Sequence, residues 1–363
     1  MTELRALTSV RGIAAWFVVL YHIRLSIAGL PVAVRDVLAK GYLAVDFFFL
    51  LSGFVIWLTW HQRLREPGNV RWFLLKRLAR IWPLHLVVLA GAVALALVLQ
   101  ATGRADPADY PFADLPLHIL LVQNWGFTGR LAWNDPSWSI SAELGAYLLF
   151  PVLVAAVDWR RVPIAALIGA AVAILMLLHV TMGAPTLGTD IPRFGLLRCL
   201  TEFATGTIVG ALWLRLRGTR SAPIAAAVGA TLLAAWALGA RETLVVPAAF
   251  ACLLLVLALT SGAARNPLEG RWLHALGEIS YATYLGHFML WVVFKLSFVS
   301  DATAVSPGLI AAYLALVLVS SIALYHLVER PAQRWINRTG RANGRPDPAL
   351  PAPATLDPGS TPG

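Results

Sequence analysis

Long apolar runs, each separated from the next by a short polar or basic segment, dominate this chain. A transmembrane helix needs about 17–25 predominantly apolar residues. A run at 114–123 is too short to cross a bilayer and predicts an interfacial or re-entrant segment. The longer runs predict an all-α polytopic membrane protein with ten transmembrane helices, near residues 12–30, 42–60, 80–100, 138–157, 163–182, 194–213, 222–240, 243–261, 276–297 and 307–328.

Composition agrees with this pattern and sets the domain organisation. The chain has 363 residues, of which 58% are hydrophobic and only 13% are charged, and its mean hydropathy is +0.71. Soluble domains carry about twice that share of charge. We expect one transmembrane domain over residues 1–331. Residues 332–363 are rich in Pro, Gly and Ala and predict a disordered cytoplasmic tail.

The net charge of +10 follows from membrane topology. Basic residues cluster in 61–80, in 214–220 and after residue 329, whereas the loop at 101–137 is rich in aspartate. If both termini are cytoplasmic, the basic clusters obey the positive-inside rule, so nucleic acid is not needed as a partner. We expect a multi-pass protein of the inner or plasma membrane. The two cysteines, Cys199 and Cys252, lie in predicted spans and indicate neither a disulfide nor a metal site.

Arg11 and His22 are retained in the first apolar segment although lipid disfavours both side chains. Eleven residues are almost three helical turns, so the two side chains share one helix face about 16 Å apart. This face carries a cation near one membrane surface and a titratable imidazole deeper in the bilayer. Alternatively, Arg11 anchors the helix by snorkelling and His22 makes an interhelical hydrogen bond.

Four further stretches place polar groups where lipid would reject them. They read VDFFFLLSGFVI, which contains Asp46; KRLARIWPLHL, which contains Lys76, Arg77 and Arg80; WNDPSWSISAELGAYLLFP, which contains Trp138, Ser139, Ser141 and Glu143; and GEISYATYLGHF, which contains His287. Arg198 and Glu202 are also intramembrane, and their i, i+4 spacing would let them neutralise each other.

Together these stretches resemble the acyltransferase-3 family of integral-membrane acyltransferases. The resemblance rests on RGIAAWFVVLYH, DFFFLLSGFVI, Arg77 and Arg80 followed by IWP, then WSISAE, ISYATYLGH and ERP, in that order from the first helix to residue 331. It implies a ten-helix domain that moves an acyl group, commonly acetyl from acetyl-CoA, to a hydroxyl of a carbohydrate or related acceptor. Acetyl-CoA would then be a co-substrate, with no permanently bound cofactor and no metal.

The residue chemistry suits that reaction. Lys76, Arg77 and Arg80 form a basic cluster at the cytoplasmic surface, and guanidinium groups match the phosphate oxygens of an acyl-CoA donor. A base within hydrogen-bond reach speeds attack by a hydroxyl about 10²–10⁴-fold, and His22 has the side chain for this role. We therefore expect His22, Arg11 and Glu143 to be catalytic.

Glu143 lies one turn after Ser139 on the same face and could orient the acceptor hydroxyl or the imidazole. It could equally be a carboxylate at a helix start. We expect acceptor-binding or supporting roles for a further set of residues, namely Asp46, Trp138, Ser139, Ser141 and His287.

Other interpretations remain open at this point. Arg77 and Arg80 could be topology determinants, and Asp46 an ordinary interfacial residue. A proton-coupled transporter or exporter would also use intramembrane His, Arg and Glu residues, although it would not explain the ordered motifs. The sequence identifies neither the acceptor, nor the acyl chain length, nor whether transfer is direct.

Overall fold

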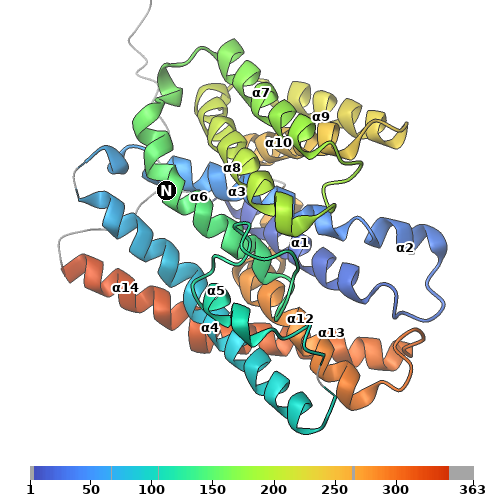
Figure 1. The fold of residues 1–363 in the computed structure, drawn as a ribbon. Helices are drawn as coiled ribbons and strands as arrows, with labels where there is room; N and C mark the ends of the chain where they lie inside the picture. The colour runs from blue at the N-terminus through green and yellow to red at the C-terminus, as the bar shows by residue number, and fades with distance from the viewer. Residues whose placement is uncertain (1–3, 67, 105, 264–265, 343–363) are drawn as a thin grey trace, which may run out of the picture.

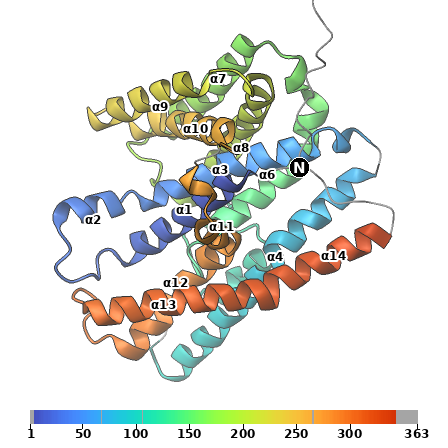
Figure 2. The same cartoon turned by 180° about the vertical axis from the view of Figure 1, so that it is seen from behind.

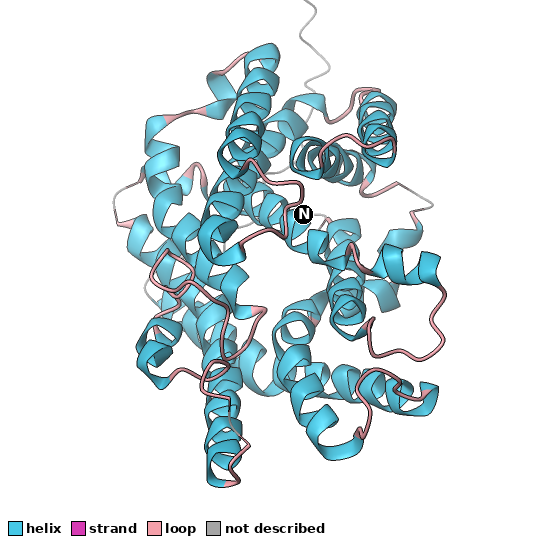
Figure 3. Cartoon of the chain, turned by 45° about the vertical axis from the view of Figure 1, so that its right-hand side comes forward, coloured by secondary structure: helices cyan, strands magenta, loops and turns pink. Residues whose placement is uncertain are grey.

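The computed structural model describes residues 4–66, 68–104, 106–263 and 266–342. These residues fold into helices joined by loops and form no β-strand, apart from one isolated bridge between Ile27 and Val305 (Figures 1 and 3). The expected all-α class is confirmed.

Each of the ten predicted spans coincides with a long helix. They are α1 (Arg5–Ile23), α3 (Ala44–Trp60), α4 (Asn69–Ala101), α6 (Ser137–Ala156), α7 (Ile164–Met182), α8 (Ile191–Leu216), α9 (Ala222–Ala237), α10 (Glu242–Thr260), α12 (Ser280–Phe298) and α13 (Pro307–Leu324). Short helices complete the fold: α2 (Val32–Leu38), α5 (Leu115–Ile119) and α11 (Arg271–Glu278). The run at 114–123 thus forms only a short helical segment.

Seven helical stretches in the described part of the chain are long and apolar enough to cross a membrane. They contain α1, α3, α4, α6, α7, α10 and α13. The other three long helices are α8, α9 and α12. Of these, α9 has only 16 residues, and α8 carries four charged side chains: Arg193, Arg198, Glu202 and Arg215. The chain is therefore a multi-pass membrane protein, and ten crossings remain a prediction.

Several predicted boundaries are wrong because hydropathy measures compatibility with lipid, whereas helices also form against protein. The first helix begins at Arg5 and ends at Ile23, not at 12–30. A break at Ile279 separates α11 from α12 within the predicted span 276–297. A π-helical turn over Tyr325–Glu329 leads from α13 directly into α14 (Arg330–Ala342). Residues 332–342 are thus helical and not part of a disordered tail, and 343–363 lie outside the described residues.

The helices form two groups around a central set (Figures 1 and 2). In both views α7, α9 and α10 lie together at one side, and α4, α13 and α14 lie at the other. Between them are α1, α3, α6, α8 and α12, which contribute most of the intramembrane polar residues. Polar side chains on these central helices, such as Asp46, Arg198 and His287, are buried in the interior of the bundle.

Close helix crossings in this centre depend on glycine. A Cβ atom at Gly53 on α3 would lie 2.0 Å from the carbonyl oxygen of Phe203 on α8, and one at Gly206 on α8 would lie 2.0 Å from that of Leu50. Small residues allow this approach in membranes because the backbones themselves make the contact. The glycine of the LSGF motif thus fixes α3 against α8.

The loop between α5 and α6 folds over one end of the central helices. Its backbone amide at Asn124 donates to Ser141 Oγ at 3.1 Å, and Trp125 Nε1 donates to the Ser141 carbonyl at 2.9 Å. Asn134 Nδ2 donates to the Leu285 carbonyl on α12 at 3.0 Å. The loop is therefore tied to both α6 and α12.

Candidate active site

One cavity in the centre of the bundle contains three arginines, and we call it the arginine cavity. Arg11 reaches it from α1, and Arg77 and Arg80 from α4. Its remaining polar lining comes from α3, α6 and α12: Ser52, Ser139, Glu143, Tyr147, Ser280, Tyr281 and Tyr284. Five of the sequence-predicted site residues, on three helices, thus meet in one place.

Arg77 and Arg80 reach the cavity together because residues three apart share a helix face. The guanidinium carbon of Arg77 lies 5.9 Å from the ring centroid of Tyr147, and its buried Nε has no hydrogen-bond partner. A buried donor without a partner is costly, so a ligand that accepts from it gains binding energy. Arg77 is therefore well placed to hold an anion.

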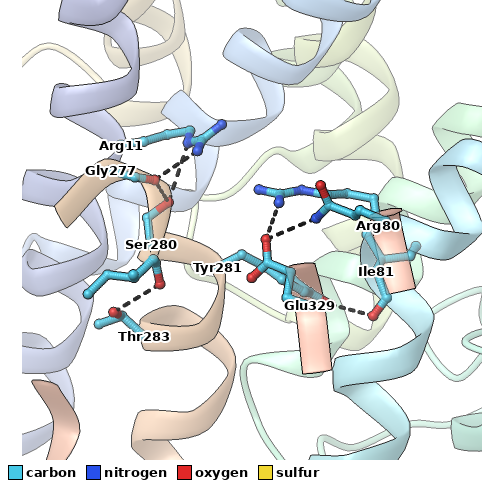
Figure 4. Close-up of polar contacts among 10 residues, drawn as sticks. Arg11, Arg80, Ile81, Gly277, Ser280, Tyr281, Thr283 and Glu329 are labelled. Atoms are coloured by element: carbon cyan, nitrogen blue, oxygen red, sulfur yellow. Dashed lines mark hydrogen bonds and ion pairs between the residues drawn. The ribbon is translucent and has the colours of Figure 1, made fainter. Parts of the chain in front are cut away.

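Arg80 is paired with a buried carboxylate (Figure 4). It forms an ion pair with Glu329, which is only 1% exposed, and Gln333 donates to the same Oε1 atom at 3.2 Å. The π-helical turn between α13 and α14 presents Glu329 to α4. Tyr281 joins this group, because its hydroxyl donates to the Ile81 carbonyl at 2.6 Å.

Arg11 contacts the break between α11 and α12. Its Nη2 donates to the Gly277 carbonyl at 2.8 Å and its Nε to Ser280 Oγ at 3.3 Å, as Figure 4 shows. A basic side chain that binds the last carbonyls of a helix satisfies groups that the helix leaves unpaired. Arg11 therefore joins the first helix to the GEISYATYLGH motif while lining the arginine cavity.

Glu143 lies in the arginine cavity. Its Oε1 accepts hydrogen bonds from Ser52 and from Tyr147, both at 2.5 Å. Ser139 lines the same cavity, in agreement with the predicted shared face. No hydrogen bond among the described residues joins Glu143 to His22, so the structure does not bring this carboxylate to the imidazole.

A second cavity contains His22, and we call it the histidine cavity. Tyr21, Tyr42 and Trp138 give it aromatic walls, and Arg198 and Asp135 give it charged groups. Leu131, Asp135 and Pro136 belong to the loop between α5 and α6, which therefore forms part of the cavity lining. Aromatic faces beside charged hydrogen-bonding groups suit a polar ligand with apolar ring faces.

The ring of His22 is held by its Nδ1 atom. This atom lies 2.9 Å from the Val18 carbonyl oxygen on the same helix and 3.2 Å from Nε2 of His287 on α12. The ring of Phe288 lies edge-on at 5.3 Å between centroids. His287 is completely buried, so its expected supporting role corresponds to direct contact with His22.

Arg198 is fixed by a buried carboxylate. Asp46 is fully buried and accepts from Arg198 Nη2 at 2.8 and 2.9 Å and from its Nε at 3.1 Å. The guanidinium carbon lies 5.1 Å from the Trp138 ring centroid, and Nη1 has no hydrogen-bond partner. The i, i+4 spacing allowed a pair with Glu202 within α8, but the ion pair of Arg198 forms with Asp46, between α8 and α3. Asp46 thus positions Arg198 and does not itself line the histidine cavity.

Asp135 lies in the loop outside the helices and lines the histidine cavity. Burial raises the pKa of its carboxyl group to about 6, and the nearby charge of Asp109 acts in the same direction. Both effects disfavour the ionised form. The charge of this cavity therefore changes between weakly acidic and neutral pH.

The two cavities share a wall. Val45 and Tyr284 line both of them. Arg11 and His22, which the helical spacing places on one face of α1, line different cavities on either side of this wall. The arrangement could hold an anionic donor on one side and a hydroxyl-bearing acceptor beside a base on the other.

Four predicted site residues lie outside both cavities: Asp46 and His287, described above, and Lys76 and Ser141. Lys76 is mostly buried, with its ammonium nitrogen 5.3 Å from the Trp72 ring centroid. Lys76 does not line the arginine cavity, although its place in the basic cluster with Arg77 and Arg80 suggested that it would. Ser141 is fully buried and holds the loop through the hydrogen bond from Asn124. Trp138, by contrast, does line the histidine cavity.

Sequence reasoning did not assign roles to Glu329, Tyr284, Arg198 or Asp135. The first two occur in the ERP and ISYATYLGH stretches, so the motif positions carried a signal without a role. Asp135 lies in the WNDPSWSISAELGAYLLFP stretch, but it received no role because a loop aspartate is usually solvated. The described residues contain no group of three or more His, Cys, Asp or Glu side chains that could hold a metal ion.

Comparison with known proteins agrees with this geometry. The family model of the acyltransferase domain, acyltransferase 3, matches residues 4–326. The chain belongs to the acyltransferase-3 family. As a member of this family it is an O-acyltransferase, and this decides against the transporter alternative.

Relatives support the same assignment over most of their length. Acyltransferase MdmB of Streptomyces mycarofaciens is 33% identical, with 96% of each chain covered. The putative membrane-bound transacylase BcsY of Komagataeibacter xylinus is 29% identical over 92% of this chain and 84% of its own. Exopolysaccharide production protein ExoZ of Rhizobium meliloti is 29% identical over 83% and 91%. No solved structure gives a significant match.

Proposed function

We propose that this acyltransferase moves an acetyl group from acetyl-CoA to a hydroxyl of a carbohydrate or a related acceptor. The donor binds in the arginine cavity from the cytoplasmic side, and the acceptor binds in the histidine cavity. The observation that carries the proposal is the separation of Arg77 from His22 into two cavities with a common wall. This separation matches a polyanionic donor and a neutral acceptor that arrive from opposite sides.

The donor assignment rests on charge. Three arginines line the first cavity, whereas Glu143 is the carboxylate among its lining residues. Phosphate groups form strong charge-assisted hydrogen bonds with guanidinium groups. Acetyl-CoA carries such phosphates and is made in the cytoplasm, which is also the side to which the positive-inside rule assigns the start of α4.

The acceptor assignment rests on the lining of the histidine cavity. Asp135 can accept hydrogen bonds from hydroxyl groups, and Arg198 Nη1 is a buried donor without a partner. Trp138 and three tyrosines offer apolar ring faces. Sugars present both hydroxyl groups and apolar ring faces. The name of ExoZ links one relative to exopolysaccharide production.

The reaction we propose is direct attack on the thioester at the wall. His22 takes the proton of the acceptor hydroxyl as the oxygen attacks the acetyl carbonyl. The hydroxyl groups of Tyr284 and Ser139 lie beside the wall and are candidate donors to the tetrahedral oxyanion. Collapse of this intermediate releases CoA thiolate, which takes up the proton.

Two experiments test the proposal. Purified protein should release free CoA thiol from acetyl-CoA when offered polar extracts that contain the acceptor, and mass spectrometry should find an acetylated product. Reporter fusions should place residue 130 outside and residue 340 inside, consistent with ten crossings of the inner or plasma membrane and two cytoplasmic termini. Absence of acyl transfer from acetyl-CoA would refute the donor, and reversed reporters would refute cytoplasmic entry.

A further inference from the structure

His287 contacts His22 but lines neither cavity. It is completely buried, and its Nε2 atom lies 3.2 Å from Nδ1 of His22. The Tyr313 hydroxyl on α13 donates to the His287 backbone carbonyl at 2.9 Å. His287 therefore acts on a reaction in the histidine cavity through the residues that it contacts, and among these His22 is the proposed base.

The neighbours of the two rings determine where the protons lie. Nδ1 of His287 faces two carbonyl oxygens, those of Thr283 at 3.1 Å and Tyr284 at 2.7 Å. Carbonyl oxygens only accept hydrogen bonds, so His287 Nδ1 carries a proton. In the neutral ring, Nε2 then has a lone pair directed at His22 Nδ1.

The neighbours of His22 fix its tautomer in the same way. Its Nδ1 faces the Val18 carbonyl oxygen at 2.9 Å and the Nε2 lone pair of His287, so it also carries a proton. The reverse arrangement would direct two lone pairs, those of His22 Nδ1 and the Val18 oxygen, at each other. The remaining nitrogen of His22, Nε2, therefore has the free lone pair that a general base needs.

We propose that His287 is a positioning residue that holds His22 in its Nδ1-protonated tautomer, so that Nε2 is the base of acyl transfer. A buried neutral imidazole here takes the role that a carboxylate takes in other enzymes with a catalytic histidine. The inference rests on the proposed function for its catalytic meaning. The tautomer itself does not depend on which acceptor is used.

The proton balance is complete. The acceptor hydroxyl proton moves to His22 Nε2, the acceptor oxygen bonds to the acetyl carbon, and the carbon–sulfur bond breaks. CoA leaves as a thiolate and is protonated by the His22 imidazolium. Throughout, His22 Nδ1–H donates to His287 Nε2 and to the Val18 carbonyl, and these acceptors stabilise the transient imidazolium.

Two substitutions at His287 separate positioning from packing. Gln can place an amide oxygen near the position of the imidazole Nε2, so His287→Gln should keep most of the kcat. His287→Leu fills a similar space without an acceptor and should lower kcat about 10–100-fold, the range typical of groups that orient a functional histidine. The KM for acetyl-CoA should stay unchanged in both. His85→Gln, at another buried histidine that lines neither cavity, is the matched control.

The tautomer can be measured without turnover. ¹⁵N NMR of histidine-labelled protein in nanodiscs, with the His22 signal assigned by its loss in His22→Gln, should show Nδ1 protonated and Nε2 unprotonated. In His287→Leu the signal should move towards a mixture of tautomers. A protonated Nε2 in the wild-type protein, or a His287→Leu variant with wild-type kcat, would overturn the positioning role. An assigned tautomer in a protein that does not transfer acetyl groups would instead refute the proposed function.

Discussion

The hydroxyl groups of Tyr284 and Ser139 lie 2.7 Å apart and join α12 to α6 at the wall between the two cavities. The Tyr284 hydroxyl also lies 3.1 Å from the Pro136 carbonyl oxygen, at the end of the loop over the histidine cavity. The tyrosine ring, only 6% exposed, therefore separates the arginine cavity from the histidine cavity. In the direct transfer that we propose, the acyl group passes at the wall that Tyr284 and Val45 form.

Removal of the Tyr284 ring should uncouple thioester cleavage from acyl transfer. Tyr284→Ala joins the two cavities, so water from the acceptor side can reach the thioester. We expect acetyl-CoA hydrolysis without acceptor to rise on the order of tenfold, measured as thiol release, while acyl transfer falls. Tyr284→Phe keeps the ring and should not raise hydrolysis above the wild-type rate. Equal hydrolysis in the wild-type protein and the Ala variant would show that Tyr284 is not a barrier.

Donor affinity should depend most on Arg77. Arg77→Ala should weaken the binding free energy of acetyl-CoA by about 1.5–3 kcal/mol, because a charge-assisted hydrogen bond is lost. The Kd of acetyl-CoA should rise accordingly. Arg77→Lys should recover only part of this, because a single ammonium lacks the guanidinium fork. Arg71→Ala removes an exposed charge from the same helix and is the control for calorimetry. An unchanged Kd in a folded Arg77→Ala variant would remove this residue from the donor site.

Arg80 should behave differently, because it is paired with buried Glu329. Arg80→Ala leaves that carboxylate uncompensated, so a loss of stability of about 3–5 kcal/mol should accompany any loss of donor binding. Combining Arg80→Ala with Glu329→Gln should restore part of the stability, measured by thermal unfolding in nanodiscs. If Arg80→Ala unfolds like the wild-type protein, the ion pair contributes nothing to stability.

The Asp46–Arg198 pair gives a second stability prediction. Asp46→Asn leaves a guanidinium group that is 1% exposed without its counter-charge, and we expect a loss of about 3–5 kcal/mol. The double substitution Asp46→Leu with Arg198→Met removes both charges and should be more stable than Asp46→Asn. Thermal unfolding of the three proteins tests the order, and a single variant as stable as the wild-type protein would contradict it.

Asp135 should make stability depend on pH. Its pKa is raised from 3.8 to about 6 in the folded protein, so the folded state binds a proton that the unfolded state has lost. Stability from this group is therefore present below pH 4 and is lost as the pH rises through 6. Asp135→Asn should be more stable than the wild-type protein at pH 7.5, by at most about 3 kcal/mol, and equal to it near pH 4. Asp106→Asn, at an exposed aspartate, is the control. If the stability difference between Asp135→Asn and the wild-type protein is the same at every pH, the pKa of Asp135 is not raised in the folded protein.

Most of the helices could be predicted from the sequence because membrane spans are defined by long apolar runs, and each of the ten runs corresponds to a helix. The ends were less predictable. α4 begins at Asn69 with several basic residues that hydropathy assigns to a loop, and they remain helical because their backbone groups still pair along the helix. The break at Ile279 is also invisible to hydropathy, which does not register the hydrogen bond from Arg11 to the nearby Gly277 carbonyl.

Site residues could be predicted where they share a helix: helical spacing paired Ser139 with Glu143, and the family resemblance paired Arg77 with Arg80. Relations between helices could not. Neither the distribution of Arg11 and His22 between two cavities nor the capture of Arg80 by Glu329 follows from one-dimensional periodicity, because the partners are far apart in sequence. The sequence did not show that Lys76 lies outside the arginine cavity, because a basic cluster does not reveal which of its members face inwards.

The most direct test of the central claim compares donor binding with acyl transfer in His22→Ala. Our account predicts a wild-type Kd for acetyl-CoA by calorimetry, because His22 does not line the arginine cavity, and a fall of about 10²–10⁴-fold in incorporation of labelled acetyl groups, because the acceptor has lost its base. Wild-type transfer by His22→Ala, or loss of acetyl-CoA binding in a folded variant, would contradict the division into a donor cavity and a base cavity.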